Sequence, residues 1–185
     1  MTEINIFPYR ALKTKLFSEP ETLFGEIKDY ELDVPCIDTG AKLKYIFRTY
    51  RFNSYLYITD IFPAMWENEK DCFKRILSHE GNRVNMRRLS VTCLVAFKEQ
   101  YIRHHKDSAM VISGSYEYGE DETAVSRKLR LYWAFFTPLL DNLSLRAVQI
   151  SSLNAFVLID KNSMKRDRDI IEEYITFKKR QNIKQ

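Results

Sequence analysis

The spacing of hydrophobic and polar positions changes several times along this chain, and the changes mark the predicted elements. Residues 42–62 are rich in tyrosine, phenylalanine, isoleucine and threonine, which are residue types enriched in strands. The turn-forming pair Asn53-Ser54 interrupts this stretch. We therefore predict two antiparallel strands, at about 42–51 and 55–62.

Capping residues and helical spacing predict further elements on both sides of this strand pair. Isoleucines within residues 2–12 indicate a short first strand. The segment 18–27 follows with a serine cap, a proline in the first turn and early carboxylates, which is typical of a helix start. After Pro63, apolar residues recur close to helical spacing over 66–78, and Gly81-Asn82 offers a stop for that helix.

The second half of the chain alternates helices with strands. Residues 84–104 place apolar side chains three and four apart, which favours a helix, although the β-branched run at 90–95 suits a strand equally well. A central strand is expected over 108–118. A helix is expected over 119–136, with acids in its first turn and a proline just beyond its end. The last elements are two strands within 145–151 and 154–161 and a helix from about 164 to 179.

These elements predict an α/β (α+β) domain with a mixed, largely antiparallel sheet flanked by helices. The expected order is β-α-β-β-α-α-β-α-β-β-α. We expect one domain over residues 1–185, with the C-terminal helix 164–180 packed on it and residues 181–185 frayed.

Composition narrows the class of protein. Hydrophobic residues make up 45% of the 185 positions, with only five glycines and five prolines, which argues against extended disorder. The longest apolar runs are shorter than the roughly 18–20 residues that a membrane span requires. The N-terminus lacks the basic start and apolar core of a secretory signal. We therefore expect a cytoplasmic protein that does not contact a membrane.

The reactive residue types are sparse and exclude several kinds of chemistry. Cys36, Cys72 and Cys93 are widely spaced and form no CxxC pair, so we expect buried free thiols. The chain has no HExxH motif and no other metal-ligand spacing, so no metal site is predicted. It also lacks the Gly-x-Ser-x-Gly elbow of serine hydrolases.

The element order resembles that of the GCN5-related N-acetyltransferase superfamily over about residues 42–160. Members of this family carry a strand pair, a cofactor-binding helix, another strand, a helix and two closing strands. The resemblance implies acetyl-CoA as cofactor, with the pantetheine held by backbone groups of Ile61 and Phe62 on the strand 55–63. It also implies that the pyrophosphate binds at the turn 79–88, where a helix N-terminus presents unpaired N–H groups. The residues implied there are Gly81, Asn82, Arg83, Arg87 and Arg88.

The pair Leu131-Tyr132 carries a second part of the resemblance. Family members often have Leu-Tyr on the helix after the fifth strand, and that tyrosine commonly protonates the leaving thiolate. The resemblance therefore implies Tyr132 as the general acid, since a phenol has a suitable pKa for this step. Phe136-Thr137 stands where the family has Gly-Phe. The alternative interpretation is that these aromatic residues only pack in the core.

Carboxylates near the predicted cofactor strand are candidates for the general base. Asp60 and Glu67 lie near its end and are candidates to accept a proton from the amine of a small molecule or protein. The favoured explanation for each is nevertheless an ordinary solvated carboxylate. The acids at 117–122 either attract a cationic amine or complete the N-terminus of the following helix, and we favour the second explanation.

A different class of function uses the cations of the chain. Basic residues are frequent in segments 83–106 and 178–184, and these segments are candidates to form a face that binds nucleic acid or a protein partner. Tyr45, Tyr50, Tyr55 and Tyr57 are candidates for stacking on bases. The two leading hypotheses are therefore an acyl-CoA-dependent N-acyltransferase and a noncatalytic binding protein. A degenerate acyltransferase fold that binds a partner would combine the two.

Overall fold

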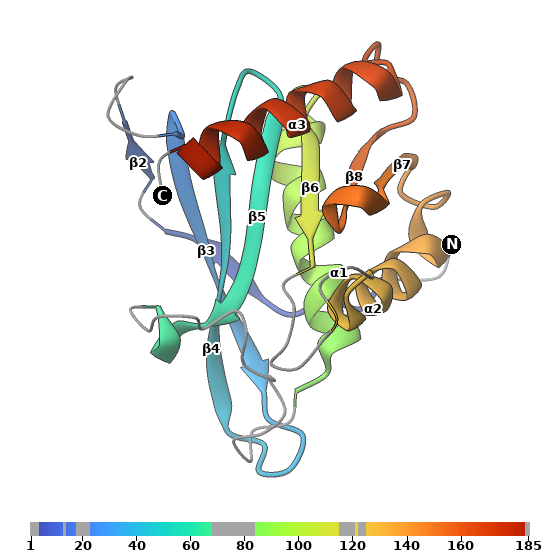
Figure 1. Ribbon diagram of the computed structural model, residues 1–185. Coiled ribbons are helices and arrows are strands. Elements are labelled where there is room, and N and C mark those ends of the chain that lie inside the picture. The colour runs from blue at the N-terminus through green and yellow to red at the C-terminus, as the bar shows by residue number, and fades with distance from the viewer. Residues whose placement is uncertain are drawn as a thin grey trace.

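A computed structural model of the protein describes residues 4–12, 14–17, 23–67, 84–114, 121 and 125–183. In this part of the chain, eight strands form one open sheet, and α-helices lie on both of its faces (Figure 1). The sheet is mixed and mostly antiparallel, as the sequence predicts. None of the described helices combines the length and the apolar character that a membrane crossing needs.

The strand order in the sheet is β1-β3-β4-β5-β6-β8-β7, and β2 also pairs with β3. Every neighbouring pair is antiparallel except β5 and β6, which run parallel. The strands are β1 (Tyr9–Ala11), β2 (Lys15–Leu16), β3 (Glu26–Pro35), β4 (Lys42–Arg51), β5 (Leu56–Pro63), β6 (Ala109–Ser113), β7 (Leu145–Ile150) and β8 (Ala155–Asp160).

The region before residue 42 corrects the predicted order. Residues 18–22 of the expected helix 18–27 lie outside the described part, and its last two positions already belong to β3. In β3 the buried Tyr30, Leu32 and Val34 alternate with the less buried Glu31 and Asp33, which is the period of a half-buried strand. Five strands therefore precede the first described α-helix, in place of the β-α-β-β start that was expected.

The later elements follow the predicted pattern with shifted boundaries. The segment 84–104 is helical, as α1 (Met86–Phe97) followed by a π-turn (Lys98–Ile102), and Asn85 caps its start by accepting a hydrogen bond from the Arg88 N–H. The other helices are α2 (Arg127–Phe136) and α3 (Asp167–Ile183). The last helix therefore continues past the expected end at 180. Most of the expected helix 66–78 lies outside the described residues, and Ala64–Trp66 forms a short 3-10 turn.

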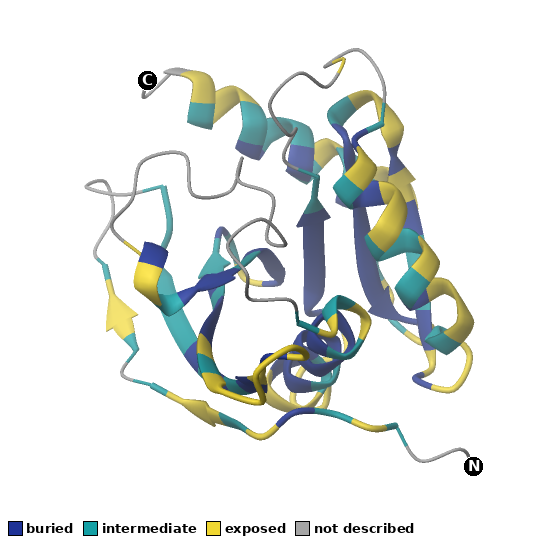
Figure 2. Cartoon of the chain, turned by 90° about the horizontal axis from the view of Figure 1, so that it is seen from below, coloured by how far each residue is buried: buried dark blue, intermediate teal, exposed yellow. Residues whose placement is uncertain are grey.

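Two apolar clusters, one on each face of the sheet, hold these layers together. On one face α1 and α2 pack against Tyr57, Met110, Phe156 and their neighbours. On the other face α3 packs through Ile170, Tyr174 and Phe177. The central strands are dark blue in Figure 2, and the outer sides of the helices are mostly yellow or teal. The sheet is therefore buried on both faces at its centre.

The parallel strands β5 and β6 pair over a short length only. Their register extends from Leu56↔Ala109 to Thr59↔Ile112. Beyond this point β5 continues to Pro63 in contact with β4, whereas β6 stays paired with β8. The two strands diverge toward their carboxyl ends, and Figure 1 shows this as a widening gap below their parallel section.

A tight corner at Gly114 holds the end of β6 on the side of β8. Gly114 exchanges hydrogen bonds with Asn154, whose side chain also accepts from the N–H of Ser126 at the start of α2. Asn154 has a left-handed backbone with φ of 47°, a conformation that asparagine tolerates better than most residues. A Cβ on Gly114 would lie 2.0 Å from Ser126 Oγ and 2.8 Å from Leu129 Cβ. Only glycine fits at this position without displacing α2.

We expect Gly114→Ala to destabilise the fold by about 1–3 kcal/mol, because the added methyl group overpacks a buried corner. The matched control is Gly25→Ala, where the nearest atom to a Cβ is Arg51 Nη2 at 3.8 Å. That change should shift the free energy of unfolding by less than about 1 kcal/mol. Equilibrium urea unfolding of both variants checks this, and equal stabilities would contradict the close packing at Gly114.

Candidate functional site

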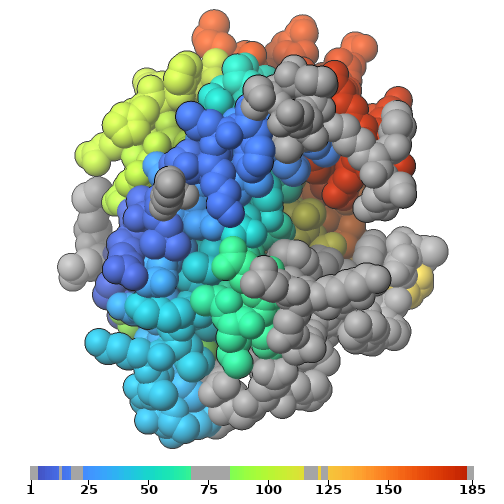
Figure 3. Space-filling model, turned by 90° about the vertical axis from the view of Figure 1, so that its left-hand side faces the viewer, coloured from blue at the N-terminus to red at the C-terminus, as the bar shows by residue number. Residues whose placement is uncertain are grey.

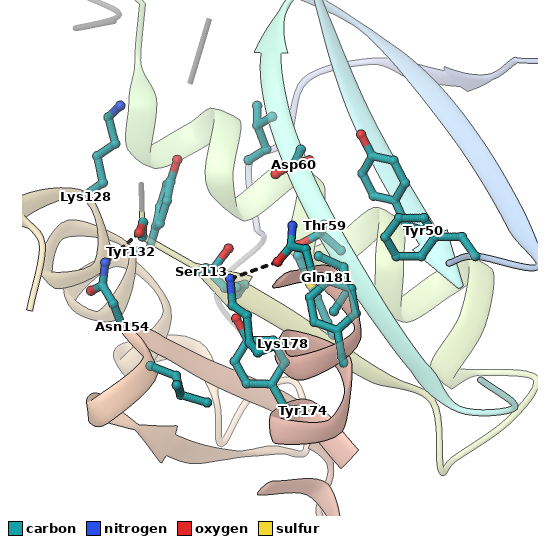
Figure 4. A pocket seen from close by; sticks show the side chains of 18 of the residues that line it. Tyr50, Thr59, Asp60, Ser113, Lys128, Tyr132, Asn154, Tyr174, Lys178 and Gln181 are labelled. Atoms are coloured by element: carbon teal, nitrogen blue, oxygen red, sulfur yellow. Dashed lines mark hydrogen bonds between the residues drawn. The ribbon is translucent and has the colours of Figure 1, made fainter. Parts of the chain in front are cut away.

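A cavity of about 950 Å³ lies where β5 and β6 separate. Its walls come from β4, β5, β6, α2, the turn 151–154 and α3 (Figure 4). In the space-filling view a hollow opens between β5 and the red end of α3, and yellow and orange atoms of more distant segments are visible at its floor (Figure 3). The divergence of the two strands therefore produces a ligand-sized space in the middle of the sheet.

The cavity reaches both faces of the sheet. Successive side chains of β5 point to opposite faces, so Ile58 and Asp60 share the face covered by α3, whereas Thr59 and Ile61 share the face covered by α1 and α2. Tyr132 of α2 lines the cavity from this second face. Two ligands that approach from opposite faces of the sheet can therefore meet in the gap.

Asp60 is the central titratable group of the cavity. It lies on β5 just after the last residue that pairs with β6. Burial raises the pKa of its carboxyl group to about 6, although the Tyr50 hydroxyl, Arg48 and Lys178 each act to lower it. The carboxylate is therefore a stronger proton acceptor than a solvated aspartate, and it is ionised in most molecules at neutral pH.

A chain of polar contacts connects Asp60 with the outer strands. Arg48 of β4 binds Asp29 of β3 in a bidentate pair, with Nε–Oδ1 and Nη2–Oδ2 distances of 2.6 and 2.7 Å. Arg48 also donates to the hydroxyl oxygen of Tyr50, which in turn donates to Asp60. The side chains of Arg48, Tyr50 and Asp60 share one face because Arg48 lies directly opposite Asp60 in the β4–β5 register. This chain fixes the orientation of the carboxylate.

Tyr132 approaches the same cavity from α2. Its ring stacks on Phe136 with a centroid distance of 6.3 Å. Burial raises the pKa of its hydroxyl, and electrostatic interactions with Cys93 and with the Asp60 carboxylate add smaller increases in the same direction. The hydroxyl is therefore protonated at neutral pH and can donate a proton, but it cannot serve as a base there.

The α3 side of the cavity carries a lysine and a hydrogen-bonded tyrosine. Lys178 Nζ donates to Gln181 Oε1 at 3.4 Å and lies 5.9 Å from the ring centres of both Tyr174 and Phe177. Burial lowers the pKa of Lys178, and the nearby charge of Asp60 opposes this decrease. The Tyr174 hydroxyl is hydrogen-bonded to Ser113 at the end of β6. Figure 4 shows Lys178, Tyr174 and Ser113 on one side of the space, with Asp60 across from them.

The structure brings together four of the residues named from sequence. Tyr132, Asp60, Ile61 and Phe62 all line the cavity. Glu67 instead pairs with Arg48 at the protein surface, so its carboxylate is already engaged there. Of the two predicted general bases, Asp60 lines the cavity.

Of the residues expected to bind pyrophosphate, the structure describes Arg87 and Arg88. Arg88 donates from Nη2 to the carbonyl of Ile6 at 2.8 Å, and its guanidinium lies over the ring of Phe7. It therefore anchors the N-terminal segment. Arg87 is exposed on the first turn of α1. The other three predicted residues, Gly81, Asn82 and Arg83, lie outside the described part of the chain.

Three contributors to the cavity have no clear signal in the sequence. Tyr50 and Lys178 belong to ordinary aromatic and basic stretches, and Asn154 belongs to a turn. One signal was available at Asp60, which is a carboxylate between apolar residues of a strand, where an ionised group is costly to bury. The other residues are brought to the cavity by elements distant in sequence.

Several of the residues named for a basic face that binds nucleic acid or a protein partner are buried or engaged in other contacts. Tyr45, Tyr55 and Tyr57 are buried, so they do not offer free ring faces for stacking on bases. Lys98 donates to the Leu143 carbonyl, and Arg88 is engaged with the N-terminal segment.

Cys36 and Cys93 are buried free thiols, as expected, and Cys72 is outside the described residues. Within the described ranges, no group of three or more histidine, cysteine or acidic side chains is arranged to hold a metal ion.

We expect the stability of Asp60→Asn, measured relative to wild type, to increase as the pH rises from about 4 to about 8. The native carboxyl group holds its proton up to about pH 6, whereas the unfolded one ionises near its model value of 3.8. Wild-type stability therefore decreases across this window, and the asparagine variant escapes a loss of up to about 3 kcal/mol. Urea unfolding at both ends of the window measures the difference.

Asp141→Asn is the matched control, because Lys161 lowers the pKa of that exposed carboxyl group. Its stability relative to wild type should change with pH in the opposite direction or hardly at all. The free energies of unfolding of Asp60→Asn and wild type are compared at both ends of the pH window. If their difference is the same at both ends, the raised pKa of Asp60 is contradicted.

Comparison with known proteins gave no match: no protein-family model, no curated protein and no solved structure is significantly similar to this chain. The function is therefore inferred from the cavity itself, from its position in the sheet and from the groups that line it.

Proposed function

We propose that the protein is an acyl-CoA-dependent N-acyltransferase that transfers an acetyl group to an amine in the cavity between β5 and β6. One observation carries the proposal. Two parallel strands separate after four paired positions, and the resulting cavity holds a proton acceptor, Asp60, and a proton donor, Tyr132, on opposite faces of the sheet. Transfer between two bound substrates requires both groups in one site.

The order of elements supports the resemblance to GCN5-related N-acetyltransferases. From β4 onward the described chain has a strand pair, the helix α1, the strand β6, the helix α2 and the closing strands β7 and β8. In that family a central strand splays from its neighbour and offers backbone groups to pantetheine. Here β5 corresponds to this strand. The five strands before α1 are a departure from the family order.

The backbone of β5 is suited to hold an extended amide-containing chain. Past Thr59, its edge toward β6 has no strand partner among the described residues. Backbone N–H and C=O groups at such an edge need partners, which water or a ligand supplies. Ile61 and Phe62 lie on this edge and line the cavity. The pantetheine of acetyl-CoA has two amide groups and can pair there as an additional strand does.

The two titratable groups have complementary roles in the transfer. The amine enters as an ammonium ion and gives one proton to Asp60, which later releases it to solvent. The neutral nitrogen attacks the thioester carbonyl carbon, and a C–N bond forms as the C–S bond breaks. Tyr132 donates its proton to the departing thiolate, and cavity water returns to it the second proton of the amine nitrogen. The products are the amide, free CoA and one proton, so atoms and charge balance.

The protonation states of both groups near neutral pH match these roles. Asp60, with a pKa of about 6, is mostly ionised at pH 7 and still basic enough to accept a proton. Tyr132, with its raised pKa, stays protonated until the thiolate forms. Arg87 on the first turn of α1 is the described cation that the proposal assigns to the pyrophosphate.

The direct test is stabilisation by the cofactor. A ligand that binds only the native protein raises its free energy of unfolding by about 2.7 kcal/mol at a hundredfold excess over Kd. We expect CoA and acetyl-CoA to raise the melting temperature in a concentration-dependent way. ADP, which lacks the pantetheine, should produce a smaller shift. Absence of any shift with CoA thioesters up to millimolar concentration would overturn the proposal.

We expect Tyr132→Phe to decrease kcat for acetyl transfer by about 10²–10⁴-fold, because the general acid is lost while the ring remains. Release of free thiol from acetyl-CoA measures the rate, and the thermal shift with CoA should persist. Tyr9→Phe is the control, since the Tyr9 hydroxyl bonds to Glu99 outside the cavity. Unchanged kcat in the Tyr132 variant would remove Tyr132 from the mechanism.

A further inference from the structure

Asp60 and Lys178 place opposite charges in the same cavity without neutralising each other directly. Asp60 projects from β5, and Lys178 projects from α3 on the same face of the sheet. The lysine ammonium is hydrogen-bonded to Gln181 and not to the carboxylate. Each charge still shifts the pKa of the other. The two groups therefore lie near each other with a space between them.

The contacts of Lys178 differ from those of the partly buried Arg48. Arg48 is partly buried like Lys178, but its guanidinium is neutralised by two hydrogen bonds to Asp29. Among the described residues, the contacts of Lys178 are a long hydrogen bond to an amide oxygen and two ring faces at a distance of 5.9 Å. A partly desolvated cation with so few partners is costly unless an anion joins it. An anionic ligand group beside Lys178 would lower this cost.

The wall next to these charges is aromatic. Phe24 packs on Tyr50 and Phe177, with ring centroids 4.9 and 5.8 Å apart. All three residues line the cavity on the side that α3 covers. An apolar side chain of a ligand gains buried surface against such a wall. The site thus offers three features: an anionic group, a cationic group and an apolar surface.

We propose that the acceptor amine is an α-amino acid with an apolar side chain, held between Asp60 and Lys178. Its ammonium group binds Asp60, its carboxylate binds Lys178, and its side chain packs against the aromatic wall. This inference rests on the proposed function, because Asp60 then takes a proton from the same nitrogen that becomes acetylated. The ammonium group of a simple amine can bind Asp60, but a simple amine has no carboxylate to bind Lys178. The site therefore discriminates against it.

The matched pair of substrates is L-phenylalanine and phenethylamine, which differ only in the carboxylate. Wild-type protein with acetyl-CoA should acetylate L-phenylalanine with the higher kcat/KM. In Lys178→Met, which keeps the aliphatic stem but loses the charge, the ratio of the two kcat/KM values should decrease by about tenfold or more. In Lys178→Glu the preference should reverse, because the new carboxylate repels that of the amino acid.

Lys179→Met is the control variant, since Lys179 is the next residue of α3 and is exposed. It should retain the wild-type ratio. An equal ratio in wild type and Lys178→Met, or a wild-type preference for phenethylamine, would overturn the recognition of the carboxylate while leaving acetyl transfer intact.

Binding without cofactor separates this inference from the proposed function. L-phenylalanine alone should raise the melting temperature of wild-type protein more than phenethylamine does, and Lys178→Met should abolish the difference. If this result appears but no amine is acetylated, amino-acid recognition holds and the acyltransferase proposal fails. If L-phenylalanine neither binds nor is acetylated, the inference is wrong.

Discussion

The separation of β5 from β6 is the constraint on which the rest of the site depends. Hydrogen bonds between the two strands end at Thr59 and Ile112, because β6 stays with β8 while β5 stays with β4. The corner at Gly114 and Asn154 keeps β6, α2 and the β7–β8 hairpin together on one side of the gap. A sheet that remained paired along its full length would have no cavity at its centre.

The gap also determines the electrostatics of the groups beside it. Asp60 belongs to a strand that is otherwise buried, so its carboxylate is poorly solvated and its pKa increases to about 6. The relay from Asp29 through Arg48 and Tyr50 keeps that carboxylate oriented and moderates the increase. Tyr132 and Lys178 come from helices on opposite faces, so the proposed proton donor and the proposed carboxylate anchor reach the cavity from opposite faces of the sheet. The proposed function therefore depends on the point at which the pairing between β5 and β6 ends.

Several elements were predictable because their signals are local. The strands at 42–51 and 55–62, the helix around α1 and the hairpin of β7 and β8 each carry their own periodicity and turn residues. The strand β3 was missed because its alternation of Tyr30, Leu32 and Val34 follows a convincing helix start at Ser18-Glu19-Pro20. The local capping signal at Ser18 therefore obscures the period-two pattern that comes after it.

The sequence by itself determined the class of fold, the apolar faces of most elements and two of the titratable groups in the site, Tyr132 and Asp60. Only the tertiary structure decided that these two share a cavity, because α2 and β5 are far apart in the chain and meet through the divergence of the sheet. It also decided that Glu67 and Arg88 are engaged elsewhere and that Lys178 enters the cavity. The physical reason is that periodicity specifies which face of an element is buried, whereas the partner of a polar side chain depends on long-range packing.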